Sequence, residues 1–213
     1  MNNHRFTRGK ITLKEHLEIL DQNAAVSIED VNRLLRRVRF VFQNCGYQRA
    51  SMSDRILQEY IILIFSAQDF RCTHWLPTTG DELNGIWNNP GTEYSKWKTS
   101  RISYEVDHVR PMNCGGIDEL TNIQFLSPNS NRFIKNALTY ESLLRRVDLS
   151  DIFKERIRKV LMQRQQLFES EKWMLFIEKI EAIERGDSYW KWNAHAAKKL
   201  NNQENILEVY KSI

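Results

Sequence analysis

Polar side chains between residues 104 and 135 form a set that could hydrolyse a phosphodiester bond. Asp107 and His108 are adjacent, and Asn131 and Lys135 follow at a spacing of one helical turn. A neutral imidazole accepts a proton from water near neutral pH, so His108 is a candidate general base. The Asp107 carboxylate and the Asn131 amide oxygen are hard ligands suited to Mg²⁺. Lys135 adds a positive charge for the phosphate or for the leaving oxygen.

Three more side chains could support this chemistry. Arg110 and Arg132 carry guanidinium groups near the set, and together with Lys135 they are candidates for binding phosphate or nucleic acid. Asn122 lies between the two halves of the set. We expect Asn122 to fix the local loop and orient the imidazole, because it is better placed for positioning than for touching substrate.

These residues need two short strands and a helix to bring them together. The pattern predicts strands over 102–106 and 122–126, with the turn region of Gly115 and Gly116 between them, and a short helix from about 128 to 137. Adjacent residues on a strand point to opposite faces. Asp107 and His108 can therefore serve one site only if the strand ends or twists there, and Pro111 is consistent with such an end.

The flanking segments are predicted to be helical. Ser27 and Asp30 have the spacing of a helix cap, and apolar residues recur after them at helical intervals. A second helix is expected to start at 51–53, and helices are expected again from about 139 to 185. The fold class is therefore mainly α with a small ββα module and helical arms on both sides. We divide the chain into a helical region 1–70, the module with its long preceding loop at 71–138, and a helical region 139–213.

Composition restricts the class of protein. The net charge of +4 and the pI near 8.9 are compatible with a nucleic-acid partner. No apolar run reaches the roughly 18 residues that a membrane span needs. Three widely spaced cysteines make a disulfide framework improbable, and the N-terminus has a polar composition without the apolar core of a signal peptide. These features favour a reducing cytoplasm.

The stretch also resembles the HNH, or ββα-metal, nuclease family. The resemblance is carried by three motifs in order: Val106-Asp107-His108-Val109-Arg110-Pro111; Gly115-Gly116 followed by Asn122-Ile123-Gln124-Phe125-Leu126; and Asn131-Arg132-x-x-Lys135. It implies that His108 is the general base, that Asp107 and Asn131 are metal ligands, and that Asn122 is a positioning residue. It further implies a metal-dependent endonuclease that acts on DNA, most naturally double-stranded DNA.

The chain departs from many members of that family at the structural zinc. Those proteins carry two Cys-x-x-Cys pairs, whereas this chain has Ser127 and Ser130 at the second pair and keeps only Cys72, followed by His74, at the first. Serine is a poor substitute for a thiolate ligand. We therefore expect no structural zinc, and we expect packing to brace the module instead. The catalytic cofactor implied is a divalent ion, Mg²⁺ first, with Mn²⁺ or Ni²⁺ as alternatives.

Several functional alternatives remain open at this level. Restriction or anti-phage defence is the expected setting of the nuclease. The alternatives are a non-catalytic nucleic-acid-binding module, or an effector whose helical arms dock a regulatory protein or a second copy of the chain. The arginines between Arg33 and Arg39 could bind phosphate or form an ordinary solvated helix face. Trp75, Trp87 and Trp97 are interpreted as anchors of the loop, with base stacking as the alternative.

Overall fold

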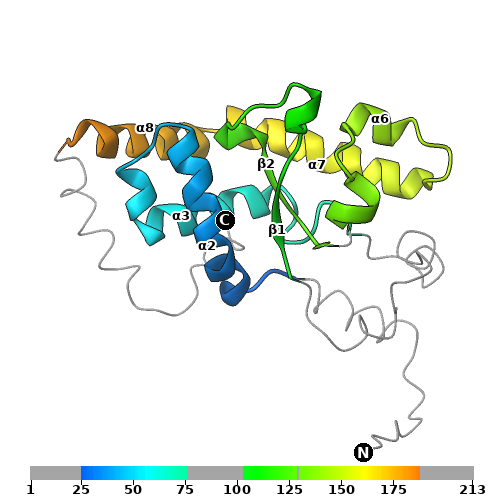
Figure 1. Cartoon of the computed structure of the whole chain (residues 1–213), viewed down its shortest axis with the longest axis horizontal. Coiled ribbons are helices and arrows are strands. Elements are labelled where there is room, and N and C mark those ends of the chain that lie inside the picture. The colour runs from blue at the N-terminus through cyan, green and yellow to red at the C-terminus, as the bar shows by residue number, and fades with distance from the viewer. Residues whose placement is uncertain (1–24, 76–102, 129, 188–213) are drawn as a thin grey trace, which may run out of the picture.

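The computed structural model describes residues 25–75, 103–128 and 130–187, and these residues are mainly helical around one small sheet (Figure 1). The predictions for Trp87 and Trp97 lie outside the described residues. Within those ranges, no helix is long and apolar enough to cross a membrane. The helices are α2 (Ile28–Asn44), α3 (Asp54–Ser66), α6 (Tyr140–Leu144), α7 (Asp151–Glu169) and α8 (Glu171–Arg185), and the strands are β1 (Glu105–His108) and β2 (Ile123–Leu126).

Helix α2 begins at the cap that the sequence predicts. The Ser27 side chain accepts a hydrogen bond from the Asp30 amide, and the Asp30 carboxylate accepts one from the Ser27 amide, which completes a capping box. One face of the helix, which includes Val31, Leu34 and Val38, is buried. The opposite face is exposed, so α2 is an amphipathic helix on the outside of the fold.

Helix α3 is the central element of the core. Its N-cap is Ser53, as the sequence predicts, and the run from Tyr60 to Phe65 is fully buried. A helix that is apolar on all sides must be surrounded by other elements. The buried Tyr60 hydroxyl donates a hydrogen bond of 2.7 Å to the Leu120 carbonyl, which connects α3 to the loop between the strands.

The two strands form an antiparallel pair in which Asp107 is opposite Gln124 and His108 is opposite Ile123. The first strand ends two residues later than predicted, so Asp107 and His108 both belong to it. On the outer edge of β2, the backbone of Phe125 pairs with a side chain and not with another strand. Its amide donates to Gln68 Oε1 at 3.0 Å, and its carbonyl accepts from Gln68 Nε2 at 2.8 Å. A buried side chain thus satisfies this edge as a third strand would.

A π-helical segment, Ser130–Lys135, follows β2 in place of the predicted α-helical turn. It lies beside α6 in Figure 1. Asn136 and Ala137 then have positive φ angles of 37° and 61°, which end the segment. Asn131 therefore sits near the start of this short helix, as predicted.

Two hydrophobic cores lie on the two faces of the sheet. The first packs α2, α3 and α8 against Ile123 and Phe125. The second packs Cys72, Trp75 and Leu126 against residues of the π-helical segment, α6 and α7. Because side chains alternate along a strand, neighbouring residues of β1 and β2 face different cores.

Candidate active site

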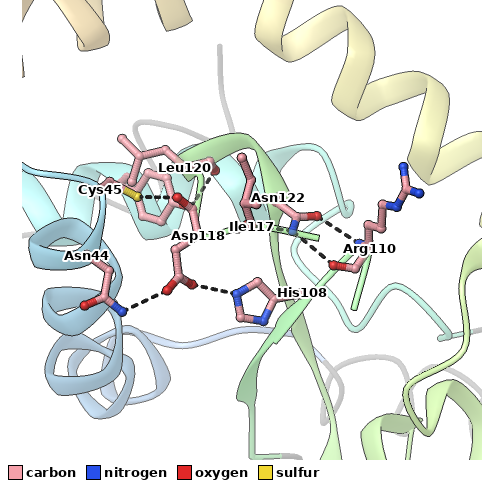
Figure 2. A network of polar contacts seen from close by, with 9 residues as sticks. Asn44, Cys45, His108, Arg110, Ile117, Asp118, Leu120 and Asn122 are labelled. Carbon is pink, nitrogen blue, oxygen red and sulfur yellow. Dashed lines mark hydrogen bonds and ion pairs between the residues drawn. The ribbon is translucent and has the colours of Figure 1, made fainter. Parts of the chain in front are cut away.

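His108 is held by a carboxylate that lies outside the predicted set. Its Nε2 atom is 2.8 Å from Asp118 Oδ1, and Asp118 Oδ2 accepts a hydrogen bond of 2.9 Å from the Asn44 amide at the end of α2 (Figure 2). The hydrogen bond from His108 holds the pKa of Asp118 below its usual range. An ionised Asp118 accepts a hydrogen bond from Nε2–H, and in the tautomer that carries this proton Nδ1 is the accepting nitrogen.

Asn122 closes the loop that carries this carboxylate. Its Oδ1 atom accepts from the Arg110 amide at 2.8 Å, and its Nδ2 atom donates to the carbonyls of Arg110 at 3.0 Å and Ile117 at 2.9 Å. Gly116 permits the closure, since a Cβ there would lie 2.0 Å from the Arg110 carbonyl oxygen. Asn122 therefore fixes the loop through three hydrogen bonds, and its expected orientation of the imidazole stays a prediction.

Asp107 lies on the opposite face of β1 from His108. Its Oδ2 atom accepts a hydrogen bond of 2.8 Å from Gln124 Nε2. Burial raises the pKa of Asp107, while the nearby Lys135 and the Gln124 hydrogen bond act in the opposite direction. The Lys135 ammonium and the Gln124 amide thus stabilise the ionised form of this partly desolvated carboxylate.

Lys135 is buried, and this burial lowers the pKa of its ammonium group. The Nζ atom donates to the Leu138 carbonyl and lies 5.3 Å from the centre of the Tyr140 ring. From this buried position the positive charge of Lys135 lowers the pKa of Asp107. The ammonium group therefore contacts Leu138 and Tyr140 inside the fold, whereas the sequence predicted a contact with phosphate.

Behind Asp107 runs a chain of buried polar groups. The Tyr140 hydroxyl donates a hydrogen bond of 2.6 Å to Gln124 Oε1 and lies 3.3 Å from His74 Nε2. Because the tyrosine proton is directed to Gln124, its oxygen accepts from His74 Nε2–H. Burial lowers the pKa of His74 to about 3, which keeps the ring neutral. The orientation of Asp107 is thus set by residues from three separate segments.

Asn131 and Arg132 both contact Glu105. The Asn131 amide donates to Glu105 Oε2 at 3.0 Å, and Arg132 NH2 is 2.6 Å from Glu105 Oε1. Glu105 and Asp107 share one face of β1, because they are two residues apart on a strand. Glu105 is therefore a second carboxylate near the predicted ligands. The period of two along the strand was a signal that could have identified it.

The Arg110 side chain is directed to the loop between the strands and not to the imidazole. Its Nε atom donates to the Cys114 carbonyl at 2.9 Å, and its guanidinium points away from His108 in Figure 2. The side chain is exposed, so it remains open to an anion on the outer side of the loop.

The residues at the expected zinc positions lie together. Cys72 Sγ is 3.4 Å from Ser130 Oγ and 3.9 Å from Ser127 Oγ, and it accepts a hydrogen bond of 3.3 Å from the Ser127 amide. All three residues are buried, and Trp75 packs in the same core at the position of the missing fourth ligand. Among the described residues no three His, Cys, Asp or Glu side chains form a metal-binding group.

The oxygen atoms of Asp107, Glu105 and Asn131 suit a hard divalent ion that keeps several ligands from water and phosphate. No protein-family model matches this sequence, and no curated protein or solved structure is significantly similar to it.

Proposed function

We propose that this chain is a metal-dependent endonuclease of the HNH type that hydrolyses phosphodiester bonds in double-stranded DNA. The observation that carries the proposal is the anchoring of His108 through Nε2 to Asp118 at 2.8 Å. It leaves Nδ1 free to accept a proton, at the point where β1 ends, on the residue that follows the candidate metal ligand Asp107 in the sequence. A residue used only for binding has no need of an imidazole fixed in one tautomer.

In the proposed reaction, His108 Nδ1 takes the proton from the water that attacks phosphorus. Asp118 keeps the imidazole in the accepting tautomer and stabilises the imidazolium that forms, as the carboxylate of other His–Asp pairs does. Asp107 and Asn131 would hold a divalent cation, with Glu105 close to Asn131. When bound, that cation supplies positive charge for the phosphate and the leaving oxygen. Arg132, which pairs with Glu105 and whose side chain is 65% exposed, would contact a phosphate oxygen.

Restriction or anti-phage defence is the setting that we propose for this activity, because a small nuclease with a mildly basic surface fits a role on foreign DNA. A second candidate is an effector whose activity a protein partner controls. Exposed apolar side chains in the loop between the strands and in the π-helical segment favour it, since Met112, Ile117 and Phe133 are each about half exposed. Large apolar groups left in solvent are typical of interaction surfaces where they form a contiguous patch.

Cleavage of supercoiled plasmid tests the proposal. Wild-type protein and His108→Ala are incubated with Mg²⁺, with Mn²⁺ and with EDTA, and binding of a labelled duplex is measured in EDTA. We expect metal-dependent nicking or linearisation by the wild type, loss of cutting by at least about 100-fold in the variant, and similar binding by both. Equal cutting by His108→Ala would exclude His108 as the base. Binding without cutting by purified wild type would instead support the partner-controlled candidate.

A further inference from the structure

One exposed edge of α2 carries a stripe of side chains that leads to the candidate active site. The stripe consists of Arg33, Arg37, Phe40 and Asn44. These residues are spaced by four, three and four positions, so on a helix with 3.6 residues per turn they fall within about 60° of one another. Arg33 and Arg37 are exposed, and Phe40 is 54% exposed.

The last residue of the stripe fixes which way the stripe faces. The Asn44 amide contacts Asp118, whose other oxygen contacts His108. Arg37 lies only about 20° around the helix from Asn44 and about 10 Å along its axis, and Arg33 lies about 20° to the other side and about 17 Å along it. Both arginines are therefore on the edge of α2 that faces the imidazole, and α2 packs beside β1 (Figure 1).

The charges around the stripe leave it positive. Arg33 makes one long contact of 3.7 Å with Asp30, and its side chain remains 68% exposed. Asp30 is itself buried and bound to Ser27, and Asp118 is engaged by His108 and Asn44. Glu29 is the acidic neighbour of Arg33, one turn before it, and lies at the end of α2 that is farthest from Asn44 and Arg37. The stripe therefore presents two exposed guanidinium groups and a half-exposed aromatic ring in one line. Groups of these kinds bind the phosphates and the sugars or bases of a nucleic-acid strand.

We propose that the α2 stripe binds the backbone of the DNA substrate beside the phosphate that is cut. This inference rests on the proposed nuclease function and names the surface that holds its substrate. Arg33 and Arg37 contact successive phosphates of one strand, and Phe40 packs against a sugar or an unstacked base. Asn44 joins this surface to His108, so the same helix that binds the strand also orients the base through Asp118.

The neighbouring Arg36 provides a matched control. It is also an exposed arginine of α2, but it lies about 80° around the helix from Asn44, whereas Arg37 lies about 20° from Asn44. Arg37→Ala and Arg36→Ala remove the same charge from the same helix. Alanine has the highest helix propensity, so both variants should keep the fold, and a thermal melt checks this.

The test is fluorescence anisotropy with a labelled duplex of DNA in EDTA, at NaCl concentrations from 50 to 200 mM. We expect Arg37→Ala to weaken binding about threefold to tenfold and to lower the salt slope by about 1. Arg33→Ala combined with Arg37→Ala should lower the slope by about 2, and Arg36→Ala should weaken binding less than about twofold. Equal effects of Arg36→Ala and Arg37→Ala, or no effect of either, would overturn the inference.

Plasmid cleavage with the same proteins separates this inference from the proposed function. If the wild type cuts DNA and Arg37→Ala binds and cuts equally well, the role of the stripe is excluded and the proposed nuclease function is supported. Binding through the stripe without metal-dependent cutting removes the nuclease and keeps the stripe. Wild type that neither binds nor cuts duplex DNA removes both.

Discussion

His108, at the end of β1, contacts Asp118 in the loop that joins the two strands, with Nε2 and Oδ1 2.8 Å apart. The histidine is the last residue of β1, and the aspartate approaches from the far side of the loop, where Asn44 of α2 holds its second oxygen at 2.9 Å. The pair therefore exists only because helix, strand and loop are docked together. Its consequence is a fixed imidazole tautomer with Nδ1 as the accepting atom.

Replacement of Asp118 tests this relationship in the proposed enzyme. Asp118→Asn keeps the shape of the side chain but removes the charge that fixes the tautomer and stabilises the imidazolium. We expect kcat to fall about 100-fold or more with little change in KM. Single-turnover cleavage of a defined duplex measures it. Asn44→Ala, which removes only the partner of the second oxygen, should reduce kcat much less, and wild-type rates for Asp118→Asn would contradict the assignment.

Asn122 should contribute to stability as well as to the shape of the loop. Asn122→Asp can still accept from the Arg110 amide, but it loses both donated hydrogen bonds and places a carboxylate against the carbonyls of Arg110 and Ile117. Each lost hydrogen bond costs about 1 kcal/mol, so we expect the free energy of unfolding to fall by about 2 kcal/mol. Urea denaturation at neutral pH measures this loss. An unchanged midpoint would show that the hydrogen bonds of Asn122 to Arg110 and Ile117 do not stabilise the protein in solution.

His74 should make the protein sensitive to acid. Its pKa is about 3 in the fold, while an unfolded chain restores the ordinary value of about 6.5. Only the unfolded chain takes up a proton between these values, so this contribution to stability falls as the pH drops below about 6.5. Between pH 6.5 and 5 the loss is about 2 kcal/mol, at about 1.4 kcal/mol per pH unit.

Urea denaturation of wild type and His74→Gln at both pH values isolates the contribution of His74. The variant is expected to be less stable at neutral pH, because the site is buried, but to lack this part of the acid dependence. The comparison uses the change with pH in each protein, so their different stabilities do not affect it. Parallel pH dependence in the two proteins would show that His74 is not buried as a neutral ring.

The cluster of Cys72, Ser127 and Ser130 should bind a metal ion when both serines are replaced by cysteine. Four sulfurs at about 2.3 Å from Zn²⁺ are separated by about 3.8 Å, and the sulfur–oxygen distances here are 3.4 and 3.9 Å. We expect Zn²⁺ to raise the Tm of the Ser127→Cys and Ser130→Cys double variant by about 5 to 10 °C at saturating concentration.

Wild type and the single variant Ser127→Cys are the controls for this measurement, because they offer one and two thiols at the cluster. Neither should gain comparable stability from Zn²⁺. A double variant that responds no more than wild type would mean that the three side chains do not converge as described.

The sequence by itself determined the helices and the order of the candidate residues. Capping residues and apolar periodicity located α2 and α3, because both signals act over a few residues and need no tertiary contact. The strands were located to within a few residues for the same reason. Asp107, His108, Asn122 and Asn131 could be selected from the types of their side chains and their spacing.

Tertiary structure alone decided which of those side chains meet. Asn44 and Asp118 are 74 positions apart, and no local pattern indicates that they share a hydrogen bond. Asp107 and His108 were expected to serve one site only if the strand ends or twists there; β1 ends at His108, and the two side chains contact different partners, Gln124 and Asp118. Lys135 has the pattern of a surface cation, yet packing of the π-helical segment against α6 and the sheet buries it. Pairings of this kind depend on how elements far apart in the chain dock, and a periodic pattern carries no record of that.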